Sequence, residues 1–166
     1  MRQFLALALL AAAFPAAAAY DANGVALGAS EQEIKKAFPS AYCKPLEWKS
    51  DASDRRCDDA KAAVGGIAVR VTFYLKKDAL QAFDLRFDTK DLDKVAALLK
   101  ERYGKPVSEV RDEIEPKAAK ARGKALYKVL WQAGRDRAVL VSQLEKKRSQ
   151  LTVSRGNWEE EIYKVR

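Results

Sequence analysis

Histidine is missing from this chain, and with it the side chain that enzymes use most often as a general base. The 166 residues contain no His, one Met and two Cys. Without His, neither a Ser-His nor a Cys-His nucleophile pair can be assembled. The serines lack the Ser-x-x-Lys and Gly-x-Ser-x-Gly patterns, and the glycines form neither a phosphate loop nor a dinucleotide-binding fingerprint. The sequence therefore predicts a protein that is not an enzyme and uses no cofactor.

Long apolar runs are also absent, except at the N-terminus. Residues 1–19 begin with one cation, Arg2, continue through an apolar run and end in alanines. This pattern is typical of a secretory signal peptide, and the run is too short to span a bilayer comfortably. We expect cleavage after Ala19, with Ala18 as the alternative, rather than a retained anchor. The mature chain, 20–166, is then a single periplasmic domain and not an integral membrane protein.

Cysteine is scarce, and export changes what the two cysteines imply. In an oxidising compartment, Cys43 and Cys57 are expected to form a disulfide with each other. The polar residues 44–56 between them are typical of a surface loop that the disulfide holds. A redox function would favour a Cys-x-x-Cys spacing, which this pair lacks.

A hairpin and a helix form the centre of the expected fold. Apolar residues alternate with polar ones over 67–75 and again over 83–87, which is the period of a half-buried strand. The short break between them predicts an antiparallel hairpin. Asp88 then predicts a helix N-cap, and apolar residues follow at helical spacing as far as Tyr103, where Gly104 ends the helix.

The flanking segments give weaker patterns. A capping box at Ser30 predicts a short first helix. Residues 58–64 are expected to form a helical turn or an irregular connection, and 107–114 an edge strand. Residues 115–124 are expected to be a mobile loop or a frayed helix. Alternation over 127–153 then predicts a meander of three strands.

These elements predict an α+β fold, an antiparallel sheet of hairpins covered on one face by two helices. A capped helix followed by a hairpin occurs twice, at Ser30 and at Asp88. The expected architecture is therefore up to two α-β-β units, although residue identity between the halves is low.

The order of these patterns resembles a known fold. Leu27-Gly28-Ala29-Ser30 leads into Glu33-Ile34-Lys35-Lys36, a hairpin follows, and the second helix ends Tyr103-Gly104-Lys105-Pro106. Over residues 25–107 this is similar to the fold shared by the small lipoprotein of the β-barrel outer-membrane assembly machine and by β-lactamase inhibitor protein. The chain departs from these families in three respects: it has no lipidation cysteine, its first helix ends without a glycine, and a disulfide loop intervenes. The resemblance implies helices packed on an antiparallel sheet and a bias towards protein binding, and it implies no individual functional residue.

Positive charge is in excess and unevenly placed. The formal net charge is +8, and removing residues 1–19 takes away only Arg2. The segment 117–148 contains ten cations and two acids, so the remainder of the mature chain is close to neutral. Such a segment is either a solvated surface or a patch for an anionic partner. Nucleic acid is not expected, because the chain is exported and has no nucleic-acid-binding motif. The candidate residues for the patch are Lys128, Arg135, Arg137, Lys146, Lys147 and Arg148.

A second candidate surface lies on the polar side of the hairpin. Tyr74 lies on that side of its strand, and Arg70 and Arg86 share it. Exposed Tyr, Trp and Arg are favoured at protein interfaces, so these three residues are the candidate partner-binding face. Alternatively, the rings of Tyr74, Trp48 and Trp158 cover an edge of the core or pack under the second helix.

Carboxylates are the last candidates for chemistry. Asp51, Asp54, Asp58 and Asp59 lie close in sequence, but they lack the regular spacing of a calcium loop, so a solvated loop is the favoured interpretation and no metal site is expected.

Two functions follow. The first is an exported module that binds another envelope protein, either as an assembly accessory or as an inhibitor or immunity protein. The alternative is a cationic binder of anionic envelope components, either lipid head groups or cell-wall polymer.

Overall fold

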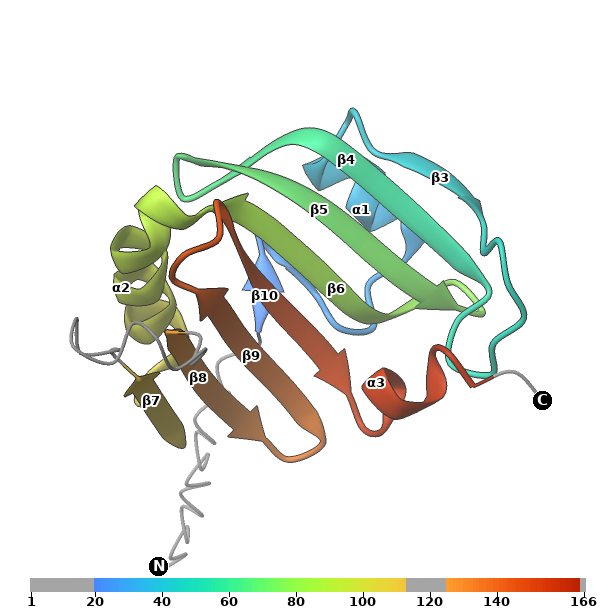
Figure 1. Ribbon diagram of the computed structural model, residues 1–166. Coiled ribbons are helices and arrows are strands. Elements are labelled where there is room, and N and C mark those ends of the chain that lie inside the picture. Colours follow the sequence, from blue (N-terminus) through green and yellow to red (C-terminus); the bar gives the residue numbers. More distant parts are fainter. Residues whose placement is uncertain (1–19, 113–124, 165–166) are drawn as a thin grey trace, which may run out of the picture.

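One helix and four strands are followed by a second helix and four more strands (Figure 1). The structure is a computed structural model, and it describes residues 20–112 and 125–164. The expected signal peptide and the segment 115–124 therefore lie outside the described residues. A two-stranded hairpin, β1 (Asp21–Ala22) and β2 (Val25–Ala26), precedes the first helix. The first unit comprises α1 (Glu31–Ala37), β3 (Tyr42–Pro45), β4 (Arg55–Val64), β5 (Ile67–Lys76) and β6 (Ala79–Asp88).

The second unit repeats this order. A 3₁₀ turn (Thr89–Asp91) leads into the second helix. The unit comprises α2 (Leu92–Tyr103), β7 (Ser108–Asp112), β8 (Leu126–Ala133), β9 (Asp136–Gln143) and β10 (Arg148–Arg155). A one-turn helix, α3 (Trp158–Glu161), follows the last strand. The helices α1 and α2 thus each precede four described strands, so the expected α-β-β unit was too short.

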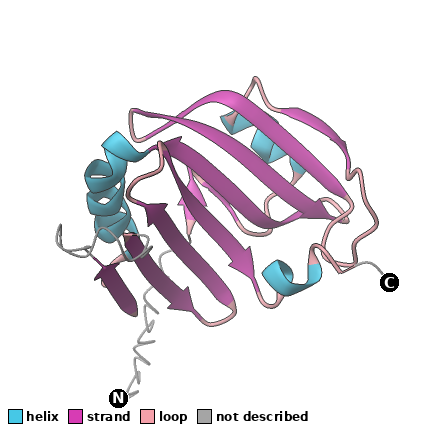
Figure 2. Cartoon of the chain, in the orientation of Figure 1, coloured by secondary structure: helices cyan, strands magenta, loops and turns pink. Residues whose placement is uncertain are grey.

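The eight strands form a single sheet in the order β3-β4-β5-β6-β10-β9-β8-β7, with every neighbouring pair antiparallel. Each unit is a four-stranded meander, and the last strands of the two meanders pair at the centre of the sheet. Figure 2 shows that strands dominate the chain. The α+β class with an antiparallel sheet is therefore confirmed, as are the central hairpin, the edge strand β7 and the meander β8 to β10.

Residues 58–64 belong to strand β4, so the expected helical turn or irregular connection was wrong. The register of β4 shifts between Asp59 and Ala62, and this irregularity breaks the apolar alternation that would have marked a strand. Asp59 is buried there, and its carboxylate accepts hydrogen bonds from the Ser40 hydroxyl (2.7 Å) and the Lys61 amide (2.9 Å). These bonds satisfy an acid that the sequence pattern placed in a solvated loop.

Local capping explains where the elements begin and turn. The Ser30 hydroxyl accepts from the Glu33 amide, and the Glu33 carboxylate accepts from the Ser30 amide, as the capping box predicts. The β5–β6 hairpin turns at Lys77 and Asp78, which both have positive φ. The Asp78 carboxylate also accepts from the Glu31 amide (2.9 Å), so the hairpin turn is attached to the start of α1.

The main hydrophobic cluster lies on one face of the sheet. Side chains of α1 and α2, including Ile34 and Leu99, belong to one hydrophobic cluster together with Phe73, Phe83 and Leu151 of the strands. Because strand residues alternate between faces, the neighbours of these strand residues lie on the opposite side, which we call the outer face. Within residues 20–112 and 125–164, every helix is too short or too polar to span a bilayer.

The expected disulfide is present. Cys43 on β3 lies opposite Cys57 on β4 in the strand register, and the two are bonded. Cys57 is fully buried in the main cluster. The bond therefore fastens the short edge strand β3 to the sheet, and residues 46–54 form the connection between the two strands.

Replacing both cysteines by serine should lower the free energy of unfolding by about 3 kcal/mol, the chain-entropy value for a loop of this length. Urea unfolding of the mature protein, with and without dithiothreitol, measures this change. Dithiothreitol should destabilise the native protein and leave the double variant unchanged. A loss below about 1 kcal/mol would show that the β3–β4 ladder alone holds the edge.

Candidate functional site

A row of cations crosses the outer face at one end of the sheet. The register places Arg70 opposite Arg86, Arg86 opposite Gln150, Gln150 opposite Val141, and Val141 opposite Lys128. Neighbouring strands are about 4.8 Å apart, so the row spans about 19 Å over five strands. Strands from both halves of the chain therefore build one continuous surface.

More cations lie beside this row. Arg148 lies opposite Asp88 at the start of β10, and Lys146 and Lys147 occupy the turn before it. We call the whole set the cationic strip. It consists of Arg70, Arg86, Lys128, Lys146, Lys147 and Arg148. All six side chains are exposed, and none forms an ion pair with another described residue. The strip unites two of the three partner-binding candidates with four of the six anionic-patch candidates.

The strip borders two hollows that share Arg148. The first hollow, of about 350 Å³, is lined by Ala60, Ala68, Val69, Arg70, Arg86, Phe87, Asp88, Lys147 and Arg148. The second hollow, of about 450 Å³, is lined by Lys128, Val139, Val141, Gln143, Lys146, Arg148, Gln150, Thr152 and Glu159. Both volumes fall in the range of sites for small ligands. The polar residues Gln143, Gln150 and Thr152 were not predicted, because only the pairing of β10 with β6 and β9 brings them to the cations.

The remaining two patch candidates lie elsewhere. Arg137 is at the opposite end of β9, where its guanidinium lies 3.3 Å from the Glu159 carboxylate. Arg135 lies in the preceding turn, and its carbonyl accepts from the Gly156 amide (2.7 Å). Arg137 therefore joins β9 to α3 through an ion pair, and neither residue belongs to the cationic strip.

Tyr74 is not on an open surface. Only 6 % of it is exposed, and its ring centroid lies 4.8 Å from that of Trp158 on α3. With Ala82 and Ile162 these rings form a second, small hydrophobic cluster on the outer face. Burial raises the pKa of the Tyr74 hydroxyl, and the nearby Asp84 charge raises it further. The structure thus separates Tyr74 from the exposed Arg70 and Arg86.

A buried acid lies between this cluster and the cationic strip. Asp84 on β6 is 9 % exposed, and its Oδ1 accepts from the Thr152 hydroxyl (2.6 Å) and the Gln150 amide (3.0 Å). Burial raises the pKa of the Asp84 carboxyl, and the two hydrogen bonds and the Arg86 charge oppose that rise. The network fixes the Gln150 side chain, whose Oε1 accepts from Arg86 (3.3 Å).

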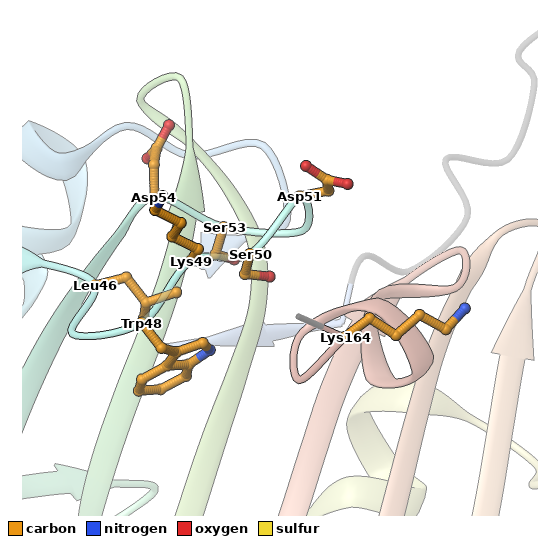
Figure 3. A pocket seen from close by; sticks show the side chains of 8 residues that line it. All are labelled: Leu46, Trp48, Lys49, Ser50, Asp51, Ser53, Asp54 and Lys164. Carbon is orange, nitrogen blue, oxygen red and sulfur yellow. The ribbon is translucent and has the colours of Figure 1, made fainter. Parts of the chain in front are cut away.

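Another hollow, beside residues 46–54, does not gather its polar groups into a site. Figure 3 shows the carboxylates of Asp51 and Asp54 pointing away from the Trp48 ring. Trp48 Nε1 donates to the Ile162 carbonyl (2.9 Å), and its ring stacks on Tyr163. The Ser50 hydroxyl donates to the Glu161 carbonyl (3.4 Å). These contacts attach the loop to the C-terminal segment.

Three of the four aspartates considered for a calcium loop accept hydrogen bonds from separate partners. The Asp54 carboxylate accepts from the Lys77 amide (2.9 Å), and Asp58 accepts from the Thr72 hydroxyl (2.8 Å). Asp59 lies on β4 as described above. Among the described residues, the one group with metal-ligand proximity is Glu31, Cys43 and Cys57, and the disulfide occupies both cysteines. This group offers one carboxylate and no thiolate, so it does not fit a metal.

Comparisons with protein-family models, with characterised proteins and with solved structures find no match for this chain.

Asp84→Asn should raise the melting temperature at pH 7, because Asn keeps an Oδ1 acceptor for Thr152 and Gln150 without a buried charge. A raised pKa means that the folded state binds this proton more tightly than the unfolded state. The protonated acid therefore stabilises the fold fully below the unfolded pKa of about 3.9, and this contribution disappears as the pH rises through the folded pKa. The gain from the substitution should shrink as the pH falls towards 4.

Thermal unfolding of both proteins between pH 4 and pH 8 measures this difference, with the exposed Asp112→Asn as the matched control. A melting temperature for Asp84→Asn below that of the native protein at pH 7 would show that the charge itself stabilises the network.

Trp158→Ala should lower the free energy of unfolding by about 3–5 kcal/mol, because it leaves a cavity over Tyr74. It also removes the hydrogen bond from Trp158 Nε1 to the Ser53 hydroxyl (3.0 Å). Urea unfolding measures the loss, and Trp48→Ala, at a half-buried position, should cost less. Equal losses for the two variants would contradict the packing of α3 described here.

Proposed function

We propose that the mature chain is an exported, non-enzymatic binding module, and that its cationic strip binds an anionic component of the cell envelope. The observation that carries this proposal is the like-charged pair Arg70 and Arg86, directly opposite each other on neighbouring strands. Like charges in such a pair destabilise a sheet. Arg148 and Lys147 line the same hollow, and Asp88 is the one acid in its lining, so the excess of positive charge favours a bound anion.

The outer face is suited to this role because the other face is occupied. We take α1 and α2 as the cover of the apolar face, since their buried side chains share the main cluster with the strands. On the outer face, α3 packs over Tyr74 and Ala82 and leaves the cationic strip exposed. The disulfide between Cys43 and Cys57 supports export, because disulfides persist in oxidising compartments.

Two classes of anionic partner fit this charge: an acidic envelope protein, and an envelope polymer or lipid head group. Protein interfaces are enriched in aromatic residues and depleted in Lys. The strip contains three lysines, and the aromatic candidate Tyr74 is buried under Trp158. These features favour the polymer or head-group class, and protein binding is the second candidate.

Reversing two charges, Arg86→Glu with Arg148→Glu, should weaken binding to anionic vesicles or acidic polymer by about tenfold or more. Each substitution removes an attraction and adds a repulsion of up to about 1 kcal/mol at an exposed site. Vesicle sedimentation and polymer affinity measurements at 50 and 300 mM salt test this. Native binding should fall steeply with salt, because exposed charges are screened within about 8 Å at physiological ionic strength.

The matched control reverses the charge of Arg102 and Lys94, both exposed on α2. It changes the net charge equally and should leave binding unchanged. Equal losses for the two double variants would show that only net charge matters. Capture of a single envelope protein at 300 mM salt, with no binding to vesicles or polymer, would instead support the second candidate.

A further inference from the structure

The second hollow differs from a simple cationic patch in that its charge is uneven. Lys146 and Arg148 line one end, and Lys128 borders it from β8. Glu159 lines it as well, and its carboxylate is held by Arg137 (3.3 Å) and the Ser154 hydroxyl (3.0 Å). A ligand with negative charge along its whole length would meet Glu159 unfavourably. The hollow therefore suits a ligand with one anionic end and one neutral, polar end.

The floor and walls of the second hollow supply the matching groups. Val139 and Val141 are half-buried and form an aliphatic part of the lining. Gln143, Gln150 and Thr152 place hydrogen-bonding groups beside them. A volume of about 450 Å³ bounded in this way matches a polar ring with one aliphatic face.

Gln143 is the side chain whose hydrogen bonds are incomplete. Gln150 donates to Asp84 and Thr152 and accepts from Arg86, so its polar atoms are engaged. The Oε1 of Gln143 is buried and has no hydrogen-bond partner among the described residues. A buried acceptor without a partner is unfavourable, and rotation of the amide would present it to a donor in the hollow.

Building on the proposed function, we infer that the second hollow binds an acidic saccharide unit of an envelope glycan. The carboxylate or phosphate of the saccharide meets Lys146 and Arg148, with Lys128 alongside. One ring hydroxyl donates to the Gln143 amide oxygen, and the aliphatic face of the ring lies on Val139 and Val141. The neutral end of the saccharide lies towards Glu159, which can accept from a hydroxyl.

Calorimetric titration of the mature protein at 50 mM salt tests this with two probes that carry equal numbers of carboxylates. One is a disaccharide of one uronate and one neutral N-acetylhexosamine, and the other is a dipeptide of glutamate and glutamine with both ends blocked. We expect the uronate disaccharide to bind about fivefold more tightly or better. Gln143→Ala should remove about fivefold of that affinity, as expected for one neutral hydrogen bond, and leave binding of the blocked dipeptide unchanged.

Gln132→Ala is the matched control, because Gln132 is exposed on β8 and does not line the second hollow. It should change neither affinity. Equal binding of both probes, insensitive to Gln143→Ala but lost in Arg86→Glu with Arg148→Glu, would overturn the saccharide inference and leave the proposed function standing. Tighter binding of the blocked dipeptide would also overturn it and favour an acidic protein. No binding of either probe or of anionic vesicles would overturn both proposals.

Discussion

The pairing of β6 with β10 is the constraint on which the rest of the structure depends. These strands end the two meanders, and their seven paired positions join residues about 60 to 70 positions apart in the chain. The cationic strip crosses this junction, with Arg70 and Arg86 on one side and Lys128 and Arg148 on the other. The Asp84 network crosses it too, through Thr152 and Gln150. The candidate site therefore exists only when the two halves are joined.

Stabilising contacts and exposed cations occupy different ends of the outer face. At one end, Trp158 and Ile162 bury Tyr74 and Ala82, and the ion pair of Arg137 with Glu159 holds α3 close to the sheet. At the other end, Arg70 and Arg86 lie directly opposite each other and form no ion pair with a described residue, an arrangement that costs stability. A ligand of opposite charge would relieve that cost, so binding and stability are linked at this end.

Local patterns predicted local structure well. The alternation over 67–75 and 83–87, the capping box at Ser30 and the cysteine pair correspond to β5, β6, the start of α1 and the disulfide. Strand β4 was missed because its register shifts next to a buried aspartate. The sequence predicted only part of the candidate site. Which cations face outwards follows from alternation, but which of them become neighbours depends on strand order, and nothing local showed that α3 would cover Tyr74.

The repeat of a helix and four strands also has a consequence for folding, because the two halves must find each other. Each meander ends in a strand, β6 or β10, and one edge of that strand forms its backbone hydrogen bonds with the other meander. Before the two halves pair, this edge is open. A neighbouring chain offers the same complementary strand. Refolding at high protein concentration therefore favours exchange of halves between molecules. Such a dimer would contain two β6–β10 pairings and two cationic strips.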